Sequence, residues 1–538
     1  MTEHSLAVFH PTCPPDVSVI VRIRDTADTL PACLESLTAQ TMPSDRFEIL
    51  AVDDGSRDDS GHIAETMLQA RSPAGKVLSH PAHLSPASTG NIGLDQARGR
   101  YVLFLCGDDR LAPRALEELT AAADQYESDM VFGKLADHTG RKPPGSMFKR
   151  TEPHVDLAAS RVYLTLTPER LIRRSFLERV GLRFDETAPA RSVDLFTAAA
   201  TLQAEGLTVL ADREYVSRGD PRNRIDRQRP TSRQLLDSTA RLMQTVIDST
   251  SPGALRNLAL ARHFEIELAH DTGQRLLGNK DAADRQRTWE HAQVLVRTYL
   301  TADVQRLLPV ALVVRYALVG LGKFSEAEEV VKFQLNGQVP KQVVEKGRVY
   351  QAYPYFRDPT VGLPDICFDS THLLNLTCSI GRFEWDGPVL GVIGHAFFEE
   401  LPAEGHEVTH LVFRERSEQI EEQFRCHRSP RARLKNKKGE SRAMGGFHVK
   451  VDLSQTGDGY PIPTGRWDVF IRTRYNGINR EVPVSIPRLK NTDFIARRPI
   501  IVSPAADHEV IAMPYYSSEG LLTVEVSQRL PLPNTPDN

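Results

Sequence analysis

The sequence has few cysteines and no apolar run long enough to cross a membrane. Its six cysteines are scattered over 538 residues and form no Cys-x-x-Cys pair, which favours free thiols in a reducing compartment over a disulfide framework or a zinc site. The first residues lack the basic start and apolar stretch of a signal peptide. The most apolar later run, Leu307–Gly322, carries Arg315 at its centre and predicts a buried helix. These absences predict a cytoplasmic protein with at most peripheral contact with the inner face of the cell membrane.

The sequence also has no large excess of positive or negative charge. A formal net charge of −4, with 25% charged and 40% hydrophobic residues, is typical of a globular protein and gives no global attraction to nucleic acid. No glycine-rich, lysine-bearing phosphate loop stands near the N-terminus, which argues against a nucleotidyltransferase of that kind. The length predicts several domains.

The first domain, predicted over residues 1–230, alternates apolar strands with amphipathic helices. This alternation predicts an α/β fold with a mostly parallel sheet. The predicted strands are Val17–Ile23, Glu48–Val52, Lys76–Ser79 and Tyr101–Leu105, and the predicted helices are Thr29–Gln40, His62–Ala70, Asn91–Arg98 and Pro113–Tyr126.

The sequence changes character twice after this domain. Residues 231–338 have few prolines and long runs with helical periodicity, which predicts a helical linker domain. Residues 339–530 show period-two alternation between glycine and proline turns, which predicts an antiparallel β-sandwich region with one or two immunoglobulin-like modules. The last residues, 531–538, are predicted to form a disordered tail.

Acidic residues follow the predicted strands of the first domain. Arg24 and Asp25 follow the first strand, and Asp53 and Asp54 follow the second. Further on stand Cys106, Asp108 and Asp109 after the fourth strand, and Asp194 before a helix. Sugar transfer from a nucleoside diphosphate needs a group that reads the base, a divalent cation on the diphosphate, and a general base for the incoming hydroxyl. Carboxylates at strand ends meet these needs, since Mg²⁺ and Mn²⁺ prefer oxygen ligands.

Several segments resemble the family 2 glycosyltransferases of the GT-A fold in order and spacing. These segments are Val17–Val21, Glu48–Asp58, Asn91–Leu105 and Asp108–Leu111. The resemblance implies inverting transfer from a nucleotide sugar. It implies that Asp53 or Asp54 faces the nucleobase, with Arg24 and Asp25 beside them. It also implies that Asp108 is the ligand of Mg²⁺ or Mn²⁺, and that Asp194 is the catalytic base.

The sequence departs from the family pattern at two positions next to these acids. Cys106 replaces the first aspartate of the Asp-x-Asp motif, and Val193 replaces the glutamate before the base. A second interpretation is therefore a weakened or inactive glycosyltransferase fold that acts as an oligomeric, polymer-binding scaffold. Arg222 and Arg224 lie where the family has a basic loop near the diphosphate, although a solvated linker explains these charges equally well.

The order of catalytic domain, helical linker and C-terminal β region resembles the wall teichoic acid glycosyltransferases of Gram-positive bacteria. This layout implies a UDP-sugar donor and an anionic cell-wall polymer, such as a poly(polyol phosphate), as the acceptor. It also implies a homo-oligomer, a trimer by resemblance, whereas the net charge of −4 predicts no nucleic-acid partner.

Overall fold

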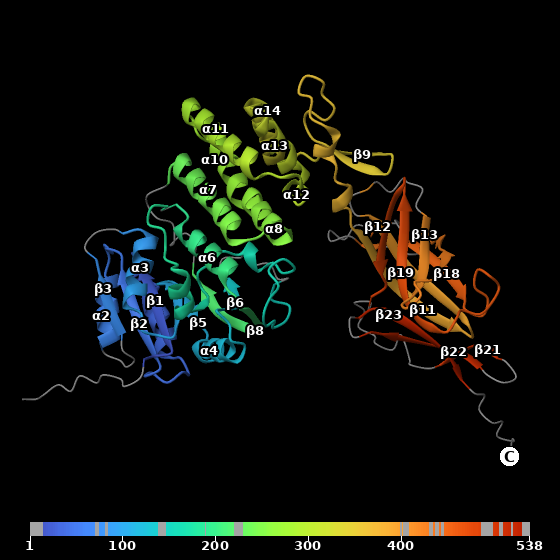
Figure 1. Cartoon of the computed structure of the whole chain (residues 1–538), viewed down its shortest axis with the longest axis horizontal. Helices are drawn as coiled ribbons and strands as arrows, with labels where there is room; N and C mark the ends of the chain where they lie inside the picture. The colour runs from blue at the N-terminus through green and yellow to red at the C-terminus, as the bar shows by residue number, and fades with distance from the viewer. Residues whose placement is uncertain are drawn as a thin grey trace, which may run out of the picture. The chain divides into compact units, whose positions relative to one another are not determined.

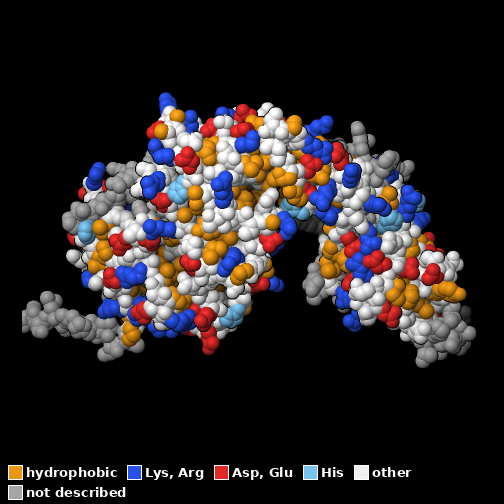
Figure 2. All heavy atoms as spheres, turned by 45° about the horizontal axis from the view of Figure 1, so that its top comes forward, with side chains coloured by type: hydrophobic (Ala, Val, Ile, Leu, Met, Phe, Trp, Pro, Cys, Tyr) orange, Lys and Arg blue, Asp and Glu red, His pale blue; other side chains and the backbone are white. Residues whose placement is uncertain are grey.

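The structure is a computed structural model, shown in Figure 1. It describes residues 14–69, 75–80, 84–137, 147–188, 190–219, 230–398, 401, 408–429, 434–435, 441–442, 446–485, 499–504, 509–517 and 520–529. The chain divides after residue 337 into two compact units. The predicted domain limits at residues 230 and 338 stay predictions. On the face shown in Figure 2, acidic and basic side chains are interspersed over both units.

The N-terminal unit begins with an eight-stranded mixed sheet in the order β3-β2-β1-β4-β7-β6-β8-β5. The strands are β1 (Val17–Ile23), β2 (Phe47–Asp53), β3 (Gly75–Ser79), β4 (Tyr101–Cys106), β5 (Arg110–Leu111), β6 (Met130–Asp137), β7 (Leu171–Arg173) and β8 (Leu207–Arg218). β1, β2, β3 and β4 run parallel, whereas β7 is antiparallel to both β4 and β6. The predicted α/β class is therefore confirmed.

Helices enclose this sheet, so its central strands are buried. The helices are α1 (Leu30–Thr38), α2 (Ser60–Gln69), α3 (Pro86–Gln96), α4 (Ala115–Gln125), η1 (Val162–Leu164), α5 (Arg174–Val180) and α6 (Ser192–Gln203). Every residue of β2 is buried, as expected for a parallel strand covered on both faces. α3 begins five residues earlier than predicted because Ser85 caps it, its side chain accepting a hydrogen bond from the Ser88 N–H at 3.1 Å.

The linker helices follow in the same unit (Figure 1). They are α7 (Ser232–Ser249), α8 (Ala254–His263), the π-helix η3 (Phe264–Leu268), α9 (Ala269–Asp271), α10 (Gln274–Leu277), α11 (Ala282–Tyr299), α12 (Ala302–Gln305), α13 (Val310–Gly320) and α14 (Phe324–Leu335). The apolar run around Arg315 forms α13, whose residues are mostly buried, Arg315 included. Among the described residues, no helix combines the length and apolar character needed to span a bilayer.

The C-terminal unit consists mainly of antiparallel strands. They are β9 (Lys341–Glu345), β10 (Arg348–Ala352), β11 (Leu376–Asp386), β12 (Val389–Phe398), β13 (Val408–Glu415), β14 (Glu421–Arg425), β15 (His427–Arg428), β16 (Leu434–Lys435), β17 (Ser441–Arg442), β18 (Gly446–Asp452), β19 (Gly465–Tyr475), β20 (Ile478–Pro483), β21 (Ile500–Pro504), β22 (Glu509–Tyr516) and β23 (Leu522–Arg529), with short 3₁₀ turns η4 (Asp365–Phe368) and η5 (Thr371–Leu373).

Two of its sheets share one core. The four-stranded sheet β11-β12-β18-β15 and the larger sheet β14-β13-β19-β23-β22-β21 contribute to one hydrophobic cluster. Val392 of β12 and Trp467 of β19 are both 0% exposed within it. The five cysteines of the described part of the chain are free, as their scattered spacing predicts.

Candidate functional site

The predicted site residues gather where parallel strands end. In the register of the sheet, Ile23 of β1 pairs with Asp53 of β2, and Arg22 pairs with Cys106 of β4. The carboxyl ends of these three strands therefore lie at one edge, which is where open α/β sheets bind their ligands.

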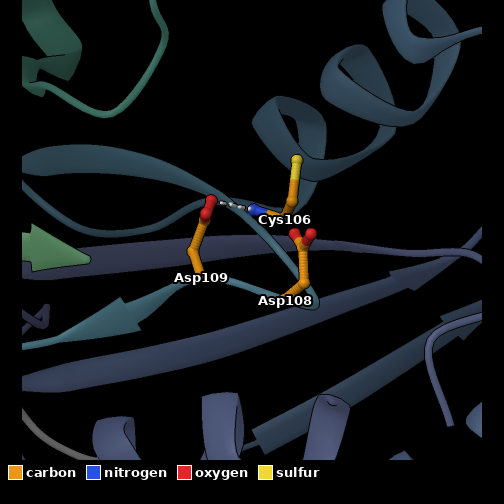
Figure 3. Close-up of side chains that lie close together, drawn as sticks. All are labelled: Cys106, Asp108 and Asp109. Carbon is orange, nitrogen blue, oxygen red and sulfur yellow. Dashed lines mark hydrogen bonds between the residues drawn. The ribbon is translucent and has the colours of Figure 1, made fainter. Parts of the chain in front are cut away.

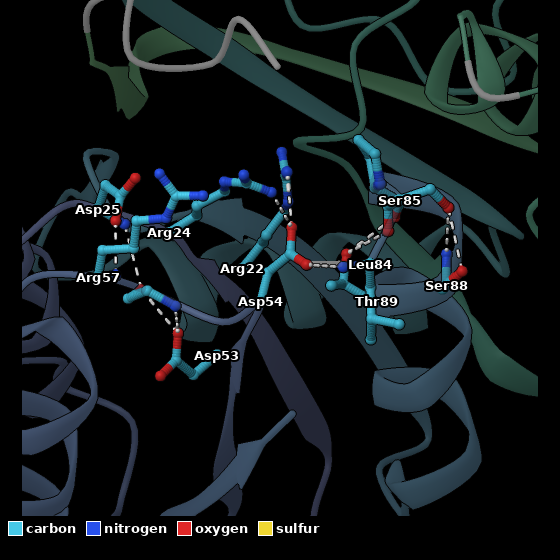
Figure 4. A network of polar contacts seen from close by, with 12 residues as sticks. Arg22, Arg24, Asp25, Asp53, Asp54, Arg57, Leu84, Ser85, Ser88 and Thr89 are labelled. Carbon is cyan, nitrogen blue, oxygen red and sulfur yellow. Dashed lines mark hydrogen bonds and ion pairs between the residues drawn. The ribbon is translucent and has the colours of Figure 1, made fainter. Parts of the chain in front are cut away.

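Asp54 lies at the centre of a charged network at this edge (Figure 4). Its carboxylate accepts hydrogen bonds from Arg22 Nη2 at 3.0 Å and Arg24 Nη1 at 3.3 Å, and from the Leu84 N–H. The side chain is completely buried, and burial raises its pKa, although the hydrogen bond from Arg22 works against that rise. Asp54 therefore holds Arg22 and Arg24 in place at the strand ends.

Asp53 and Asp25 join the loops that follow β1 and β2. Asp53 Oδ1 accepts hydrogen bonds from Ser56 N at 3.0 Å and Ser56 Oγ at 2.6 Å. Asp25, whose φ is +46°, accepts from the Arg57 N–H at 2.8 Å, and its own N–H donates to Ser56 Oγ at 3.2 Å. Figure 4 shows the carboxylates of Asp53 and Asp54 pointing to different sides of the loop. Asp53 and Asp54 are therefore adjacent in sequence but bind different partners.

Cys106, the last residue of β4, forms the β4 acidic group with Asp108 and Asp109, which follow the strand (Figure 3). One potential ligand atom from each residue lies within 4.8 Å of those of the others. Asp109 bridges the backbone here, because its carboxylate accepts from Cys106 N at 2.9 Å and from Gly219 N at 3.0 Å. Asp108 is 8% exposed, and its carboxylate points to the same side as the Cys106 sulfur. Asp108 is therefore the carboxylate of this group best oriented for a cation.

A cavity of about 300 Å³ opens beside this group. Arg22 of β1 and Cys106 of β4 line it on the sheet side, and Asp194 and Arg218 line it from α6 and β8. Arg218 also pairs with Glu169 Oε1 at 3.4 Å. The structure thus brings Asp194 and Cys106, the first residue of the β4 group, to one cavity, although they are far apart in sequence. Arg222 and Arg224 lie outside the described residues.

Asp194 stands in the first turn of α6 with a partly buried side chain. Burial and the negative charge of Glu267 raise its pKa to about 6, while Arg262 and Arg191 act in the opposite direction. A carboxylate with a pKa near neutrality is suited to general-base work.

Sequence reasoning missed the linker residues near Asp194. Arg262 and His263 of α8 and Glu267 of η3 are buried in the same unit, where Tyr163 of η1 donates or accepts a hydrogen bond with His263 Nε2 at 2.9 Å. The available signal was the occurrence of several charged residues within the apolar-periodic segment Leu255–Leu268. Charged residues in such a segment require partners when they are buried.

Comparison with protein families agrees with this geometry. Residues 18–181 match the model of glycosyl transferase family 2, residues 232–331 that of the glycosyl transferase TarS linker domain, and residues 371–522 that of the TarS beta-glycosyltransferase C-terminal domain 1. The strand ends and the β4 acidic group lie within residues 18–181, the part matched by the family 2 model. Asp194 lies shortly after that part.

Two curated relatives match the first domain. A poly(ribitol-phosphate) beta-glucosyltransferase of Bacillus spizizenii is 33% identical over 199 residues, which is 37% of this chain and 31% of the relative. The poly(ribitol-phosphate) beta-N-acetylglucosaminyltransferase TarS of Staphylococcus aureus is 34% identical over 198 residues, which is 37% of this chain and 34% of the relative. The aligned region thus spans about a third of the length of these relatives.

Solved structures extend the likeness in fold to most of the chain. S. aureus TarS superposes with a TM-score of 0.59 at 21% identity, over 95% of this chain and 85% of that protein. A complex of S. aureus TarS 1–349 with UDP-GlcNAc superposes with a TM-score of 0.54 at 23% identity, over 63% of this chain and 97% of that chain.

The mixed sheet and its acidic strand ends form the region that matches the glycosyl transferase family 2 model, and this region has the fold of a GT-A domain. Three successive parts of the chain thus resemble a family 2 glycosyl transferase domain, the TarS linker domain and the first TarS C-terminal domain.

Proposed function

We propose that the protein transfers a sugar, with inversion, from a UDP-sugar to a hydroxyl of an anionic poly(polyol phosphate) such as a teichoic acid. The observation that carries this proposal is the cavity that Asp194 shares with Cys106 and the end of β4. This shared cavity supports Asp194 as the base and the group that begins at Cys106 as the acidic group expected at the donor diphosphate. The named substrates of the curated relatives, both poly(ribitol-phosphate) glycosyltransferases, support the acceptor class.

The side chains of the β4 acidic group carry atoms that can bind a divalent cation. Asp108 supplies a carboxylate, and Cys106 places a thiol within 4.8 Å of it. Asp108 would hold Mg²⁺ or Mn²⁺, and a bound cation would stabilise the charge of the departing diphosphate. Asp109 serves the fold of this loop by accepting hydrogen bonds from the N–H groups of Cys106 and Gly219.

The protein side chains then have distinct tasks. Asp194 accepts the proton of the acceptor hydroxyl while the hydroxyl oxygen forms a bond to the anomeric carbon of the donor sugar. The bond from that carbon to the diphosphate breaks, and its electrons leave with UDP. Arg22 and Arg24, which Asp54 holds, together with Asp25 and Asp53, form the wall expected to receive the nucleoside. Arg222 and Arg224 would contact the diphosphate.

A transfer assay tests this function. The protein is incubated with UDP-GlcNAc or UDP-glucose and poly(ribitol phosphate), with Mn²⁺, Mg²⁺ or EDTA. We expect transfer only with a divalent cation. Asp194→Asn should lower kcat by about 10²–10⁴-fold and leave UDP binding intact, because the general base is lost. Asp108→Asn should instead abolish cation-dependent UDP binding.

Asp124→Asn is the matched control, since Asp124 pairs with Arg100 and Tyr101 away from the cavity. Retention of more than a tenth of the rate by Asp194→Asn would contradict the assignment of the base. UDP binding by the native protein without any transfer would favour the polymer-binding scaffold instead.

A further inference from the structure

Arg191, at the start of α6, is tied to two linker helices by its guanidinium group. Arg191 Nη1 donates a hydrogen bond to the Leu235 carbonyl of α7 at 3.0 Å. Arg191 Nη2 lies 3.0 Å from Asp271 Oδ1 of α9 and forms an ion pair with it. Asp271 is itself held by α7, because its Oδ2 accepts a hydrogen bond from Thr239 Oγ1 at 3.2 Å. Two linker helices therefore hold one side chain of the first domain.

The same residue begins the first turn of α6, which carries Asp194. Arg191 is the N-cap of this helix, and its carbonyl accepts a hydrogen bond from the Leu195 N–H at 2.9 Å. Val193 and Asp194 of this turn line the cavity that Cys106 also lines. The backbone that presents Asp194 to the cavity thus starts at a residue whose side chain is anchored on the linker.

Helix capping does not explain an arginine at this position. Serine, threonine, aspartate and asparagine are preferred at N-caps, because their short side chains accept hydrogen bonds from the first N–H groups of the helix. A guanidinium group has no acceptor atom, and the Arg191 side chain makes no capping bond within the described part of the chain. It extends to α7 and α9 instead, so this position serves the contact with the linker.

The ion pair at this contact is buried. The side chains of Arg191 and Asp271 are 9% and 2% exposed. Desolvation of two charges offsets most of their attraction, so well-packed apolar residues of similar volume often give equal or higher stability. The pair differs from an apolar contact in its directionality, because the planar guanidinium group donates along fixed directions. It is therefore better suited to fix a position than to add stability.

The buried side chains along the rest of α6 are mostly apolar. The ring of Phe196 stacks on that of Phe184, another residue of the cavity wall, with the ring centroids 4.0 Å apart. Burial of apolar surface is favourable but non-directional, so these contacts constrain the rotation of the helix about its axis only loosely. Arg191 adds a directional contact at the end of the helix where Asp194 lies.

We propose that Arg191 is a positioning residue of the transfer reaction, whose ion pair with Asp271 holds the first turn of α6, and with it the Asp194 carboxylate, at the cavity. The inference rests on the proposed function, in which Asp194 is the base. Misplacement of a reacting group by about 1 Å can cost about 10²-fold in rate, so the pair affects kcat without contacting substrate. The linker helices thereby contribute to catalysis, although the residues that line the cavity belong to the first domain.

The test removes the ion pair and keeps the side-chain volume. In the full chain with Arg191→Met and Asp271→Leu, urea unfolding should occur close to the native midpoint, because neither charge stays buried without its partner. The kcat for transfer from UDP-GlcNAc or UDP-glucose to poly(ribitol phosphate) should fall by about 10–100-fold. The rate is expressed per UDP-binding site, counted by calorimetry with Mn²⁺, so that a smaller folded fraction is not taken for a slower reaction.

Two further readouts distinguish positioning of the base from a general loss of structure. The affinity for UDP with Mn²⁺ should stay at the native value, because Arg22 and Asp108 lie at the ends of β1 and β4 and not on α6. Arg191→Lys keeps a positive charge for Asp271 but lacks the planar fork of the guanidinium group. Its kcat should lie between those of the native protein and the double variant.

Glu48→Gln with Arg98→Met is the matched control. Glu48 is also a buried carboxylate paired with an arginine, with Arg98 Nη2 at 2.8 Å from Oε2. It lies near the start of β2, whereas Asp53 ends that strand at the candidate site. Neither Glu48 nor Arg98 is among the described residues that line the cavity. We expect the native kcat per binding site in this control.

The outcomes separate the two proposals. A fall of kcat in the Arg191 and Asp271 double variant, with native UDP affinity and a native rate in the control, supports the inference. A native kcat in the double variant, an equal fall in the control, or a loss of UDP affinity that accounts for the whole effect overturns it, and the proposed function still stands if Asp194→Asn loses transfer. If Asp194→Asn transfers at the native rate, the base is wrongly assigned and the positioning role falls with it.

Discussion

At the scale of single residues, the site contains carboxylates of the same chemical type in very different environments. Asp54 is fully buried and pairs with Arg22 and Arg24. Asp194 instead lines a cavity, and the pKa of its carboxyl is raised to about 6. The first arrangement keeps a charge in place. The second produces a group that exchanges a proton near neutral pH.

Asp194 should therefore cost stability above pH 6. Its folded-state pKa of about 6 lies above its ordinary value of 3.8, so the unfolded chain releases this proton first, and the free energy of unfolding falls as pH rises from about 4 through about 6. Asp194→Asn removes this loss. The variant should be more stable than the native protein at pH 8 by about 1–3 kcal/mol, and equally stable near pH 4.

Urea unfolding of the two proteins at both pH values measures this difference. The control is Asp124→Asn, because the hydrogen bond from Arg100 lowers the pKa of Asp124 and its removal should destabilise the protein at pH 8. An Asp194→Asn variant that is less stable than the native protein at pH 8 would contradict the prediction.

Gly219 limits the space around Asp108. A Cβ at this position would lie 2.3 Å from both Cγ and Oδ2 of Asp108, a distance at which one group must move. Gly219→Ala should therefore displace the Asp108 carboxylate and weaken Mn²⁺-dependent UDP binding by about tenfold or more. Gly320→Ala is the control, since its new Cβ would meet Val296 at an ordinary 3.7 Å. Calorimetric titration of UDP with Mn²⁺ measures both, and equal affinities would refute the prediction.

At the scale of secondary-structure elements, the π-helix η3 receives a hydrogen bond from the neighbouring helix α13. Tyr316 Oη donates to the Phe264 carbonyl at the start of this turn at 2.6 Å, and Tyr316 is 0% exposed. Tyr316→Phe leaves that buried carbonyl without its donor and should lower the free energy of unfolding by about 1–3 kcal/mol.

Tyr299→Phe provides the comparison, because the Tyr299 hydroxyl donates to Gln244 Oε1 at 3.0 Å in an exposed position where water replaces it. Urea unfolding should show a clearly larger loss for Tyr316→Phe. Equal losses would mean that the turn does not depend on this hydrogen bond.

At the scale of the whole molecule, the groups proposed for donor binding and proton transfer all belong to the N-terminal unit. A fragment ending at Gly337 should therefore fold and bind UDP-GlcNAc with the affinity of the full chain. Calorimetry on both proteins checks this, with the Asp108→Asn fragment as the control without cation-dependent binding. A fragment that is folded by circular dichroism but binds UDP-GlcNAc more weakly would show that the β unit contributes to the donor site.

The sequence by itself determined the elements and their order. Buried parallel strands appear as apolar runs, and their ends appear as acids followed by glycine and serine, because these properties depend on neighbouring residues. The α/β class, the helical segment and the antiparallel C-terminal sheets were predictable in this way. The start of α3 was not, because the Ser85 cap lies outside the apolar pattern of the helix.

Only the tertiary structure decided what each acid does. Asp53 and Asp54 are adjacent in sequence, yet one binds Ser56 and the other binds Arg22 and Arg24. Asp194 and Cys106 are far apart in sequence, yet they line one cavity. Burial and the charge of distant neighbours set the pKa and orientation of a carboxylate, and these arise only when segments far apart in the sequence pack together.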